Sequence, residues 1–202
     1  MKLHIIGDGV FGNFLREIFS PFVEFSPAAD NVVLAVPIEA YEEVAAQYLG
    51  KHLINVCSVQ RDSNNICLQF SDQVTGIHPL FGPRSPIENR VAVLTHRCEQ
   101  TPELQALFEK LGAEVCDELP DGRSIDGELH DRMMADTHLA GLQQLATLKK
   151  IVENSAWVPK KFIPASFQRL QNFVEQSGDF SPGTLSSIQA NPYAEKEYAT
   201  EE

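Results

Sequence analysis

The chain has no apolar run long enough to cross a membrane. A membrane-spanning helix takes about 20 consecutive apolar residues, and no stretch of the 202 residues approaches that length. Met1 is followed almost at once by a strand-like segment, where a signal peptide would place a basic stretch and then an apolar one. The sequence therefore predicts a cytoplasmic protein with no membrane partner.

Basic residues are scarce. The chain carries 16 Lys and Arg against 28 Asp and Glu, which gives a formal net charge of -12. Binding to nucleic acid or to an anionic membrane surface requires clustered positive charge, so we expect neither partner. An anionic ligand would have to be bound by a few local cations and by backbone N–H groups.

Cysteine is also rare, and its spacing excludes the common cysteine motifs. The four cysteines are Cys57, Cys67, Cys98 and Cys116, and no two of them form a CxxC pair, which is the spacing that zinc sites and redox motifs use. In a cytosolic protein such residues are expected to be buried, reduced thiols. We therefore expect no disulfide and no metal site.

A glycine loop follows the first apolar segment of the chain. Leu3–Ile6 has the pattern of a buried strand, and Val10–Phe19 has the apolar spacing of an amphipathic helix. The loop that joins them and enters the helix consists of Gly7, Asp8, Gly9, Val10, Phe11 and Gly12. A G-x-G-x-x-G pattern between a strand and a helix indicates a site for NAD or NADP.

Each glycine of this loop has a physical role in such a site. Gly7 permits the tight turn, Gly9 lets the backbone approach a pyrophosphate, and Gly12 lets the helix pack closely on the strand. The N-terminus of the helix adds N–H donors and the positive end of its dipole. The alternative is a structural glycine turn that binds no ligand.

The first 119 residues alternate strand and helix signals. Strand-like segments occur at Leu3–Ile6, Phe22–Phe25, Asn31–Val36, Leu53–Val59, Val91–Thr95 and Ala113–Cys116. Helical spacing occurs at Val10–Phe19 and Glu39–Tyr48, and a third helix opens at Thr101 and stops at Gly112. This alternation predicts an α/β domain over residues 1–119, with a doubly wound, mostly parallel sheet of the Rossmann type.

One crossover of this sheet is too short for a helix. Only residues 21–30 separate the first helix from the strand at Asn31. A dinucleotide-binding fold normally has an acidic residue at the end of its second strand, where it binds the adenosine ribose. Glu24 or Ser26 lies nearest to that place, and neither decides between NAD and NADP. We expect the adenine side of the site to be open.

Residues 120–202 have a helical character. Leucines recur at helical spacing from Glu128 to about Asn154, and further helices are predicted at Ala165–Gln176 and Pro182–Ala190. The acidic residues 195–202 are typical of a solvated tail. We expect a small all-helical domain for dimerisation and substrate binding. A homodimer is predicted because the apolar face of the long helix needs a cover.

A histidine-proline turn in the middle of the chain completes a set of motifs. The set is Asp30 to Pro37, Asn55 to Gln60, His78-Pro79-Leu80-Phe81-Gly82-Pro83, and Glu128-Leu129-His130-Asp131. In that order these segments resemble the prephenate/arogenate dehydrogenases of tyrosine biosynthesis. The resemblance extends from Met1 to about Ala190. It places Val36 and Pro37 beside the cofactor.

The resemblance implies an NAD(P)-dependent oxidative decarboxylation of prephenate to 4-hydroxyphenylpyruvate, or of arogenate to tyrosine. Such a step needs a base of near-neutral pKa within hydrogen-bond reach of the substrate hydroxyl, and histidine suits that role. By the match, His78 is this base, Ser58 positions the substrate and nicotinamide, and His130 faces the interdomain cleft. The alternative for His78 is a histidine that caps a strand end.

The substrate carries two carboxylates, so its site needs a cation. Arg169 resembles the carboxylate-binding arginine of the family, since a guanidinium can bind a carboxylate through two hydrogen bonds. Arg84 is a second candidate, and a solvated surface charge is the alternative for both. Gln60 is a third expected substrate-binding residue, because it stands near the reaction centre where the family commonly has a lysine. Asn55 stands where an aspartate is usual.

Two other functions stay open at this point. One is an NAD(P) oxidoreductase that acts on a different carboxylate. The other is a non-catalytic protein that senses a dinucleotide or an aromatic metabolite, because one fold hosts many functions. The chain is also shorter than typical members of the family, which would fit an altered specificity or a lost activity.

Overall fold

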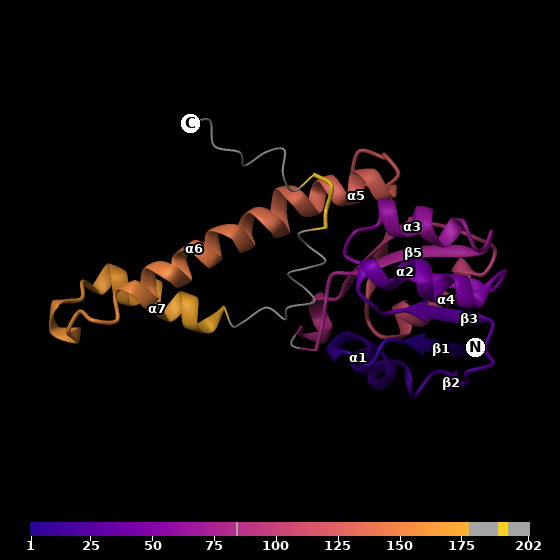
Figure 1. Cartoon of the computed structure of the whole chain (residues 1–202), viewed down its shortest axis with the longest axis horizontal. Coiled ribbons are helices and arrows are strands. Elements are labelled where there is room, and N and C mark those ends of the chain that lie inside the picture. The colour runs from indigo at the N-terminus through magenta and orange to yellow at the C-terminus, as the bar shows by residue number, and fades with distance from the viewer. Residues whose placement is uncertain (84, 178–189, 194–202) are drawn as a thin grey trace.

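The computed structural model describes residues 1–83, 85–177 and 190–193 (Figure 1). In this part of the chain seven strands form one sheet in the order β2-β1-β3-β4-β5-β6-β7. Their bounds are β1 Lys2–Ile6, β2 Glu24–Phe25, β3 Asn31–Leu34, β4 His52–Asn55, β5 Val74–Pro79, β6 Val91–His96 and β7 Glu114–Cys116. All neighbours are parallel except β5 and β6, which are antiparallel. The predicted α/β sheet is confirmed.

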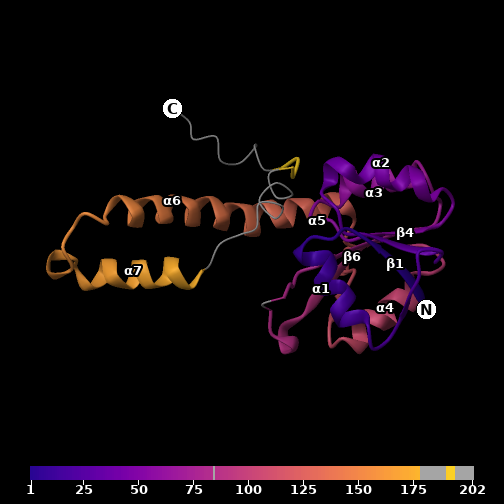
Figure 2. The same cartoon turned by 60° about the horizontal axis from the view of Figure 1, so that its bottom comes forward.

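Helices cover both faces of the sheet (Figure 2). The helices α1 (Val10–Phe19) and α4 (Thr101–Lys110) lie on one face, where Phe19 of α1 packs edge to face on Phe108 of α4. The helices α2 (Tyr41–Ala45) and α3 (Arg61–Leu68) lie on the other face. Two helical layers around a parallel sheet explain why its inner strands are apolar on both sides.

The connection from β2 to β3 contains no helix, as its short length predicts. The strand β2 has two residues, and residues 26–30 lead from it directly into β3 on the other side of β1. No helix and no outer strand intervene in this described segment. The chain thus changes direction between β1 and β3, and ligands of doubly wound sheets bind at the carboxyl ends of the strands at such a switch point.

A helical arm leaves the sheet domain. The helix α5 (Gly127–Met134) packs on α3 and β6, a π-helical turn follows at Ala135–Leu139, and α6 (Ala140–Asn154) continues away from the sheet. A 3-10 turn at Lys160–Phe162 leads to α7 (Ala165–Gln176), which lies along α6 (Figures 1 and 2). We call residues 140–177 the arm.

The helices predicted at Glu128–Asn154 and Ala165–Gln176 are present, the first of them interrupted by the π-helical turn. The helix predicted at Pro182–Ala190 lies outside the described residues except for Ala190, which is in a turn, and the acidic tail lies outside them entirely. No described helix is both long and apolar enough to span a membrane.

Candidate functional site

The glycine loop lies at the carboxyl end of β1, where three backbone segments are in contact. Gly7 has φ +116°, in the region that favours glycine. A Cβ atom on Gly7 would lie 2.1 Å from the carbonyl oxygen of Ala35, and one on Gly12 would lie 2.1 Å from that of Gly7. Neither position can carry a side chain, so β1, β3 and α1 meet here at backbone distance.

Gly9 is glycine for a different reason. It precedes α1 with an ordinary φ of −71°, and a Cβ atom on it would meet no protein atom within 4 Å. The open space at Gly9 therefore lies directly before the N-terminus of a ten-residue helix. Free N–H groups and the helix dipole favour an anion at such a place. These residues fit the pyrophosphate of a dinucleotide.

Asp8 brings a negative charge into this loop, and Arg16 of α1 balances it. The Asp8 carboxylate is exposed and lies 3.0 Å from the Arg16 guanidinium. Arg16 also donates a hydrogen bond to the carbonyl oxygen of Ile5 at 2.8 Å. Because the guanidinium is tied to β1, the charge of Asp8 is compensated close to the anion site.

The other predicted cofactor residues divide into two groups. Val36 and Pro37 follow β3 at the same edge of the sheet, and Val36 Cγ1 would lie 3.4 Å from a Cβ atom on Gly7. Ser26 donates its backbone N–H to the carbonyl oxygen of Leu3 at 3.0 Å. It therefore lies near the level of His4, short of the end of β1 at Ile6. The structure places Val36 at the loop, with Pro37 next to it in the chain, and leaves Ser26 away from the loop.

His78 lies in β5, whose carboxyl end is at the same edge as the glycine loop, and it contacts a second histidine. Its Nδ1 atom is 2.9 Å from Nε2 of His130 in α5, and the two rings meet edge to face with centroids 5.0 Å apart. His130 Nδ1 is 2.8 Å from Oδ1 of Asp131. His78 is half-buried, whereas His130 and Asp131 are fully buried.

Asp131 is held by the first turn of α3. Its Oδ1 accepts the backbone N–H of Gln60 at 2.7 Å, and its Oδ2 accepts that of Arg61 at 2.9 Å. A carboxylate at a helix N-terminus is stabilised by these donors and by the helix dipole. The three hydrogen bonds to Asp131 explain how a carboxylate is accommodated in a buried position.

This arrangement sets the tautomers of both histidines. Asp131 acts as an acceptor, so His130 donates from Nδ1 and its Nε2 carries a lone pair. That lone pair accepts the Nδ1–H of His78. The remaining nitrogen of His78, Nε2, is then an unprotonated acceptor. In this tautomer Nε2 is the nitrogen of His78 that can act as a proton acceptor.

His130 differs from its predicted placement. Its imidazole has no exposed surface, so the expectation that it faces the interdomain cleft is wrong. It lies behind His78 because Asp131, fixed on α3, draws its ring inward. Ser58 follows β4, is half-buried, and makes no hydrogen bond with its side chain to the described residues.

Gln60 offers no polar side-chain atom to a substrate, which corrects its prediction as a substrate-binding residue. It is fully buried; its Nε2 donates to the Cys57 carbonyl at 2.6 Å, and its Oε1 accepts from Thr95 Oγ1 at 2.6 Å. Asn55 lies in the same network, with Oδ1 2.8 Å from the Tyr41 hydroxyl and Nδ2 donating to Ser63. These two residues support the turn that carries Ser58.

The predicted arginines are not part of this cluster. Arg169 is exposed on α7, which lies along α6 and away from the sheet (Figures 1 and 2). Arg84 lies outside the described residues. In the described part of the chain, no group of three or more His, Cys, Asp or Glu side chains could hold a metal ion.

Asp131 is a member of the site that was not predicted from the sequence. Asp131 stands next to His130 in one of the quoted motifs, but adjacent side chains on a helix point in different directions. Its contact with the N-terminus of α3, 70 residues away in the chain, depends on the fold. The signal for this role is that Asp131 and the adjacent His130 are both buried. Burial cannot be read from the sequence, so the sequence alone offers no such signal.

Neither a protein-family model nor a curated protein sequence matches the chain. Solved structures do match it. A protein from Corynebacterium glutamicum provisionally assigned as a prephenate dehydrogenase superposes with a TM-score of 0.67 and 17% identity, over 94% of this chain and 74% of that one.

Two further enzymes share the architecture. Prephenate dehydrogenase from Aquifex aeolicus, in complex with hydroxyphenyl propionate and NAD+, superposes with a TM-score of 0.59 and 16% identity, over 94% of this chain and 86% of that one. Arogenate dehydrogenase from Synechocystis gives 0.53 and 18%, over 94% of this chain and 87% of that one. The chain therefore has the fold of these dehydrogenases.

Proposed function

We propose that this chain is an NAD(P)-dependent dehydrogenase that oxidatively decarboxylates prephenate or arogenate. One observation carries the proposal: His78 lies at the same edge of the sheet as the glycine loop, and His130 and Asp131 set its tautomer. The fold shared with prephenate and arogenate dehydrogenases supports this substrate class.

The chain's own residues perform three tasks in this reaction. The loop from Gly7 to Gly12 and the start of α1 bind the pyrophosphate of NAD or NADP, and Val36 and Pro37 border the cofactor. A bound nicotinamide would supply the acceptor for the hydride of the ring carbon that bears the hydroxyl. His78 takes the hydroxyl proton at Nε2, and Ser58 orients the substrate beside it.

His78 holds the hydroxyl proton while the ring is oxidised and decarboxylated. As the hydroxyl proton and the hydride leave, the C–OH carbon becomes a carbonyl carbon, and carbon dioxide then departs from the ring. The electron pair of the broken C–C bond makes the ring aromatic and places negative charge on the former carbonyl oxygen. This oxygen takes back the proton that His78 accepted. The products are 4-hydroxyphenylpyruvate or tyrosine, with carbon dioxide and the reduced cofactor. Arg169 and Arg84 remain the predicted ligands of the substrate carboxylates.

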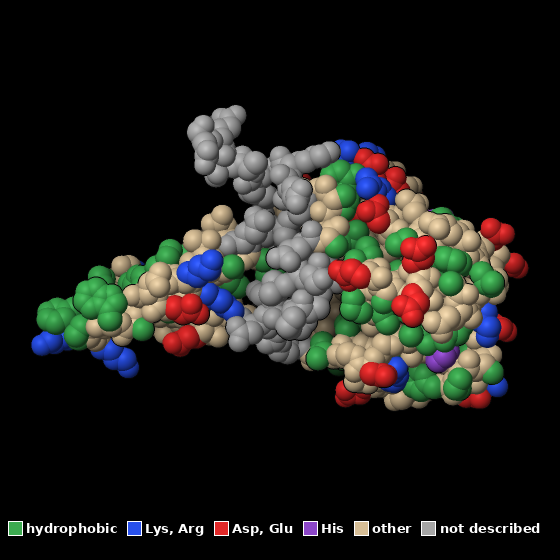
Figure 3. Space-filling model, viewed as in Figure 1, with side chains coloured by type: hydrophobic (Ala, Val, Ile, Leu, Met, Phe, Trp, Pro, Cys, Tyr) green, Lys and Arg blue, Asp and Glu red, His purple; other side chains and the backbone are tan. Residues whose placement is uncertain are grey.

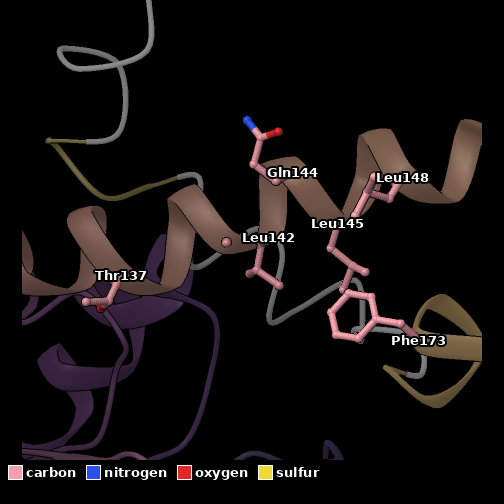
Figure 4. A pocket seen from close by; sticks show the side chains of 7 residues that line it. Thr137, Leu142, Gln144, Leu145, Leu148 and Phe173 are labelled. Carbon is pink, nitrogen blue, oxygen red and sulfur yellow. The ribbon is translucent and has the colours of Figure 1, made fainter. Parts of the chain in front are cut away.

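We also propose that the protein is a homodimer joined through the arm. An apolar groove of about 450 Å³ opens between α6 and α7, lined by Leu142, Leu145, Leu148 and Phe173 among others (Figure 4). Large hydrophobic side chains are exposed along the arm, with Trp157 at 83% and Phe162 at 65%, and such side chains gather at its free end (Figure 3). The arm of a second copy would bury these surfaces.

Turnover tests the enzyme proposal. Reduced-nicotinamide absorbance would be followed with prephenate and with arogenate, each with NAD and with NADP. We expect one pair to react, and His78→Asn to reduce kcat by at least about 100-fold while cofactor affinity is retained. His96→Asn is the control, because His96 is a histidine on β6 that lies opposite Gly76 of β5. Cofactor binding without turnover for any pair would contradict the proposal and favour a sensor or another substrate.

Sedimentation tests the dimer. Phe173 lines the groove and is 56% exposed, and Phe22 in the sheet domain is 44% exposed. We expect Phe173→Glu to give a monomer and Phe22→Glu to leave the dimer intact. A monomer in the unmutated protein at micromolar concentration would contradict the proposal.

A further inference from the structure

The last described segment of the chain returns to the sheet domain and contacts Asp131. Residues 190–193, which we call the clasp, lie beside the end of α5, where Figure 1 shows them in yellow. Asn191 is buried, and its Nδ2 donates to the backbone carbonyl oxygen of Asp131 at 2.8 Å. Its Oδ1 accepts the backbone N–H of Tyr193 at 2.9 Å. Both ends of the Asn191 amide are therefore engaged.

Tyr193 connects the clasp to α3 and α5 at once. Its hydroxyl accepts a hydrogen bond from Arg61 Nη1 at 3.1 Å. Its ring faces two guanidinium groups, with the Arg132 carbon 5.1 Å and the Arg61 carbon 5.7 Å from the centroid, a cation–π arrangement. Arg61 begins α3 and Arg132 follows Asp131 on α5. The clasp thus spans the two helices that the Asp131 carboxylate joins.

The carbonyl that Asn191 binds lies at a special point of the helix. The same Asp131 carbonyl accepts the backbone N–H of Ala135, and the π-helical turn begins at Ala135. A second donor at a helix carbonyl fixes the local path of the backbone where helix geometry changes. That path determines where the side chains of His130 and Asp131 point.

We propose that Asn191 is a positioning residue for His78. It fixes the backbone of Asp131, Asp131 fixes the His130 tautomer, and His130 fixes that of His78. The role in catalysis rests on the proposed function, because it takes His78 as the base. The geometric effect on the two imidazoles does not depend on it.

Histidine side-chain NMR tests the geometric part on the full-length protein without substrate. Long-range ¹H–¹⁵N spectra distinguish the two neutral tautomers and give the titration of each imidazole. Asn191→Ala removes the donor, and Asn191→Asp keeps the size but places a carboxylate oxygen against the Asp131 carbonyl. We expect both variants to shift the imidazole signals of His78 and His130 and to populate the second tautomer of His78.

Asn172→Ala is the matched control, because Asn172 is an exposed asparagine on α7; it should leave these signals unchanged. If Asn191→Ala fails to fold, Asn191→Asp and Tyr193→Phe, which removes only the hydroxyl bound by Arg61, provide the comparison. Imidazole signals that are unchanged in the folded clasp variants would overturn the proposal.

Kinetics test the catalytic part. We expect Asn191→Asp to lower kcat by roughly tenfold to a hundredfold, as misplacement of a catalytic group does, and to displace the acid limb of the kcat/KM profile against pH. The Kd of the cofactor should stay within about twofold, since the clasp lies away from the glycine loop. A kcat and pH profile like those of the unmutated enzyme would overturn the positioning role. If the unmutated protein shows no turnover, the proposed function fails, and the NMR comparison still decides the geometric inference.

Discussion

A Cβ atom on Gly127 would lie 2.7 Å from Cα and 2.8 Å from the backbone nitrogen of Arg61. The first residue of α5 therefore touches the first residue of α3, and this contact lets Asp131, one turn later on α5, reach the N–H groups of α3. The residue type at position 127 controls the distance between the two helices on which His130 depends.

Gly127→Ala should separate these helices. We expect a loss of about 1–3 kcal/mol in the free energy of unfolding, the usual cost of overpacking, together with a change in the His78 and His130 imidazole signals. Gly141→Ala on α6 is the control, because a Cβ atom there would meet nothing within 4 Å and alanine favours a helix. Equal stability of both variants in urea unfolding would contradict the role given to this contact.

Alanine substitutions at two glycines of the loop should have different effects, one on cofactor affinity and the other on stability. Gly9→Ala places a methyl group in open space before α1, so stability should be retained while the Kd for NAD or NADP rises roughly tenfold or more. Gly12→Ala places it 2.1 Å from the Gly7 carbonyl oxygen and should lower the melting temperature. Calorimetric titration and thermal unfolding separate these effects. A Gly9→Ala protein with unchanged affinity would show that no ligand enters this space.

Asp131→Asn tests the chain of hydrogen bonds behind His78. The carboxylate accepts the N–H groups of Gln60, Arg61 and His130, and an amide would turn one of these contacts into two opposed donors. We expect a loss of about 1–3 kcal/mol in stability and a fall in kcat of about 100-fold or more, because the preferred tautomer of His78 changes. Asp136→Asn, an exposed residue further along the same helical segment, should change neither. Full activity of Asp131→Asn would exclude a role for the tautomers.

Six of the seven described strands and the helices α1, α2 and α4 could be predicted because local patterns determine them, whereas β5, which carries His78, was not predicted as a strand. Apolar runs such as Asn31 to Leu34 and the glycine loop have meaning without the rest of the fold, and α1 begins and ends where the sequence places it. The helix α3 is different. It begins Arg-Asp-Ser-Asn-Asn, a polar run with no apolar spacing, and it is stabilised by buried polar contacts such as Asn64 with Asn55.

The candidate site was predictable in part for the same reason. His78 and the glycine loop belong to local motifs, so their types and spacing indicate chemistry directly. The burial of Gln60 and His130 depends on contacts between β4, α3 and α5, and the Asn191 contact joins positions 60 residues apart. Such contacts have no local pattern, which explains why Gln60 was expected at the substrate and Asp131 was missed.

A buried histidine far from the loop gives the protein a predictable response to acid. His52, in β4, is 3% exposed, with Nδ1 2.8 Å from Oδ1 of Asn31 and Nε2 2.8 Å from Oγ1 of Thr75. The Asn31 amide donates its own Nδ2 to Lys2, so its Oδ1 accepts from His52, and Nε2 accepts the Thr75 hydroxyl. The neutral ring satisfies both partners, and burial lowers the pKa of His52 from 6.5 to about 4.

This shift predicts lower stability in acid. An unfolded imidazole with a pKa of 6.5 takes up a proton before the folded one does, so the unfolded state binds more protons between pH 6.5 and 4. Stability therefore rises with pH in this window and is lost as the pH falls through it. Burial also lowers the pKa values of His4 and His96, which adds to the same trend. Carboxylates also titrate near pH 4, at the lower end of this pH window. The contribution of His52 therefore has to be measured against a variant that lacks this histidine.

His52→Gln provides that comparison. Urea unfolding of both proteins at pH 7, 6 and 5 gives the free energy of unfolding as a function of pH. The variant should be less stable at pH 7, because it loses the ring that fills the site and bridges Asn31 to Thr75. We expect the difference in free energy of unfolding between the unmutated protein and the variant to become smaller by roughly 1–2 kcal/mol between pH 7 and pH 5. Each unit of pKa difference corresponds to 1.36 kcal/mol. A difference that stays constant with pH would mean that His52 is protonated in the folded protein as easily as in the unfolded chain.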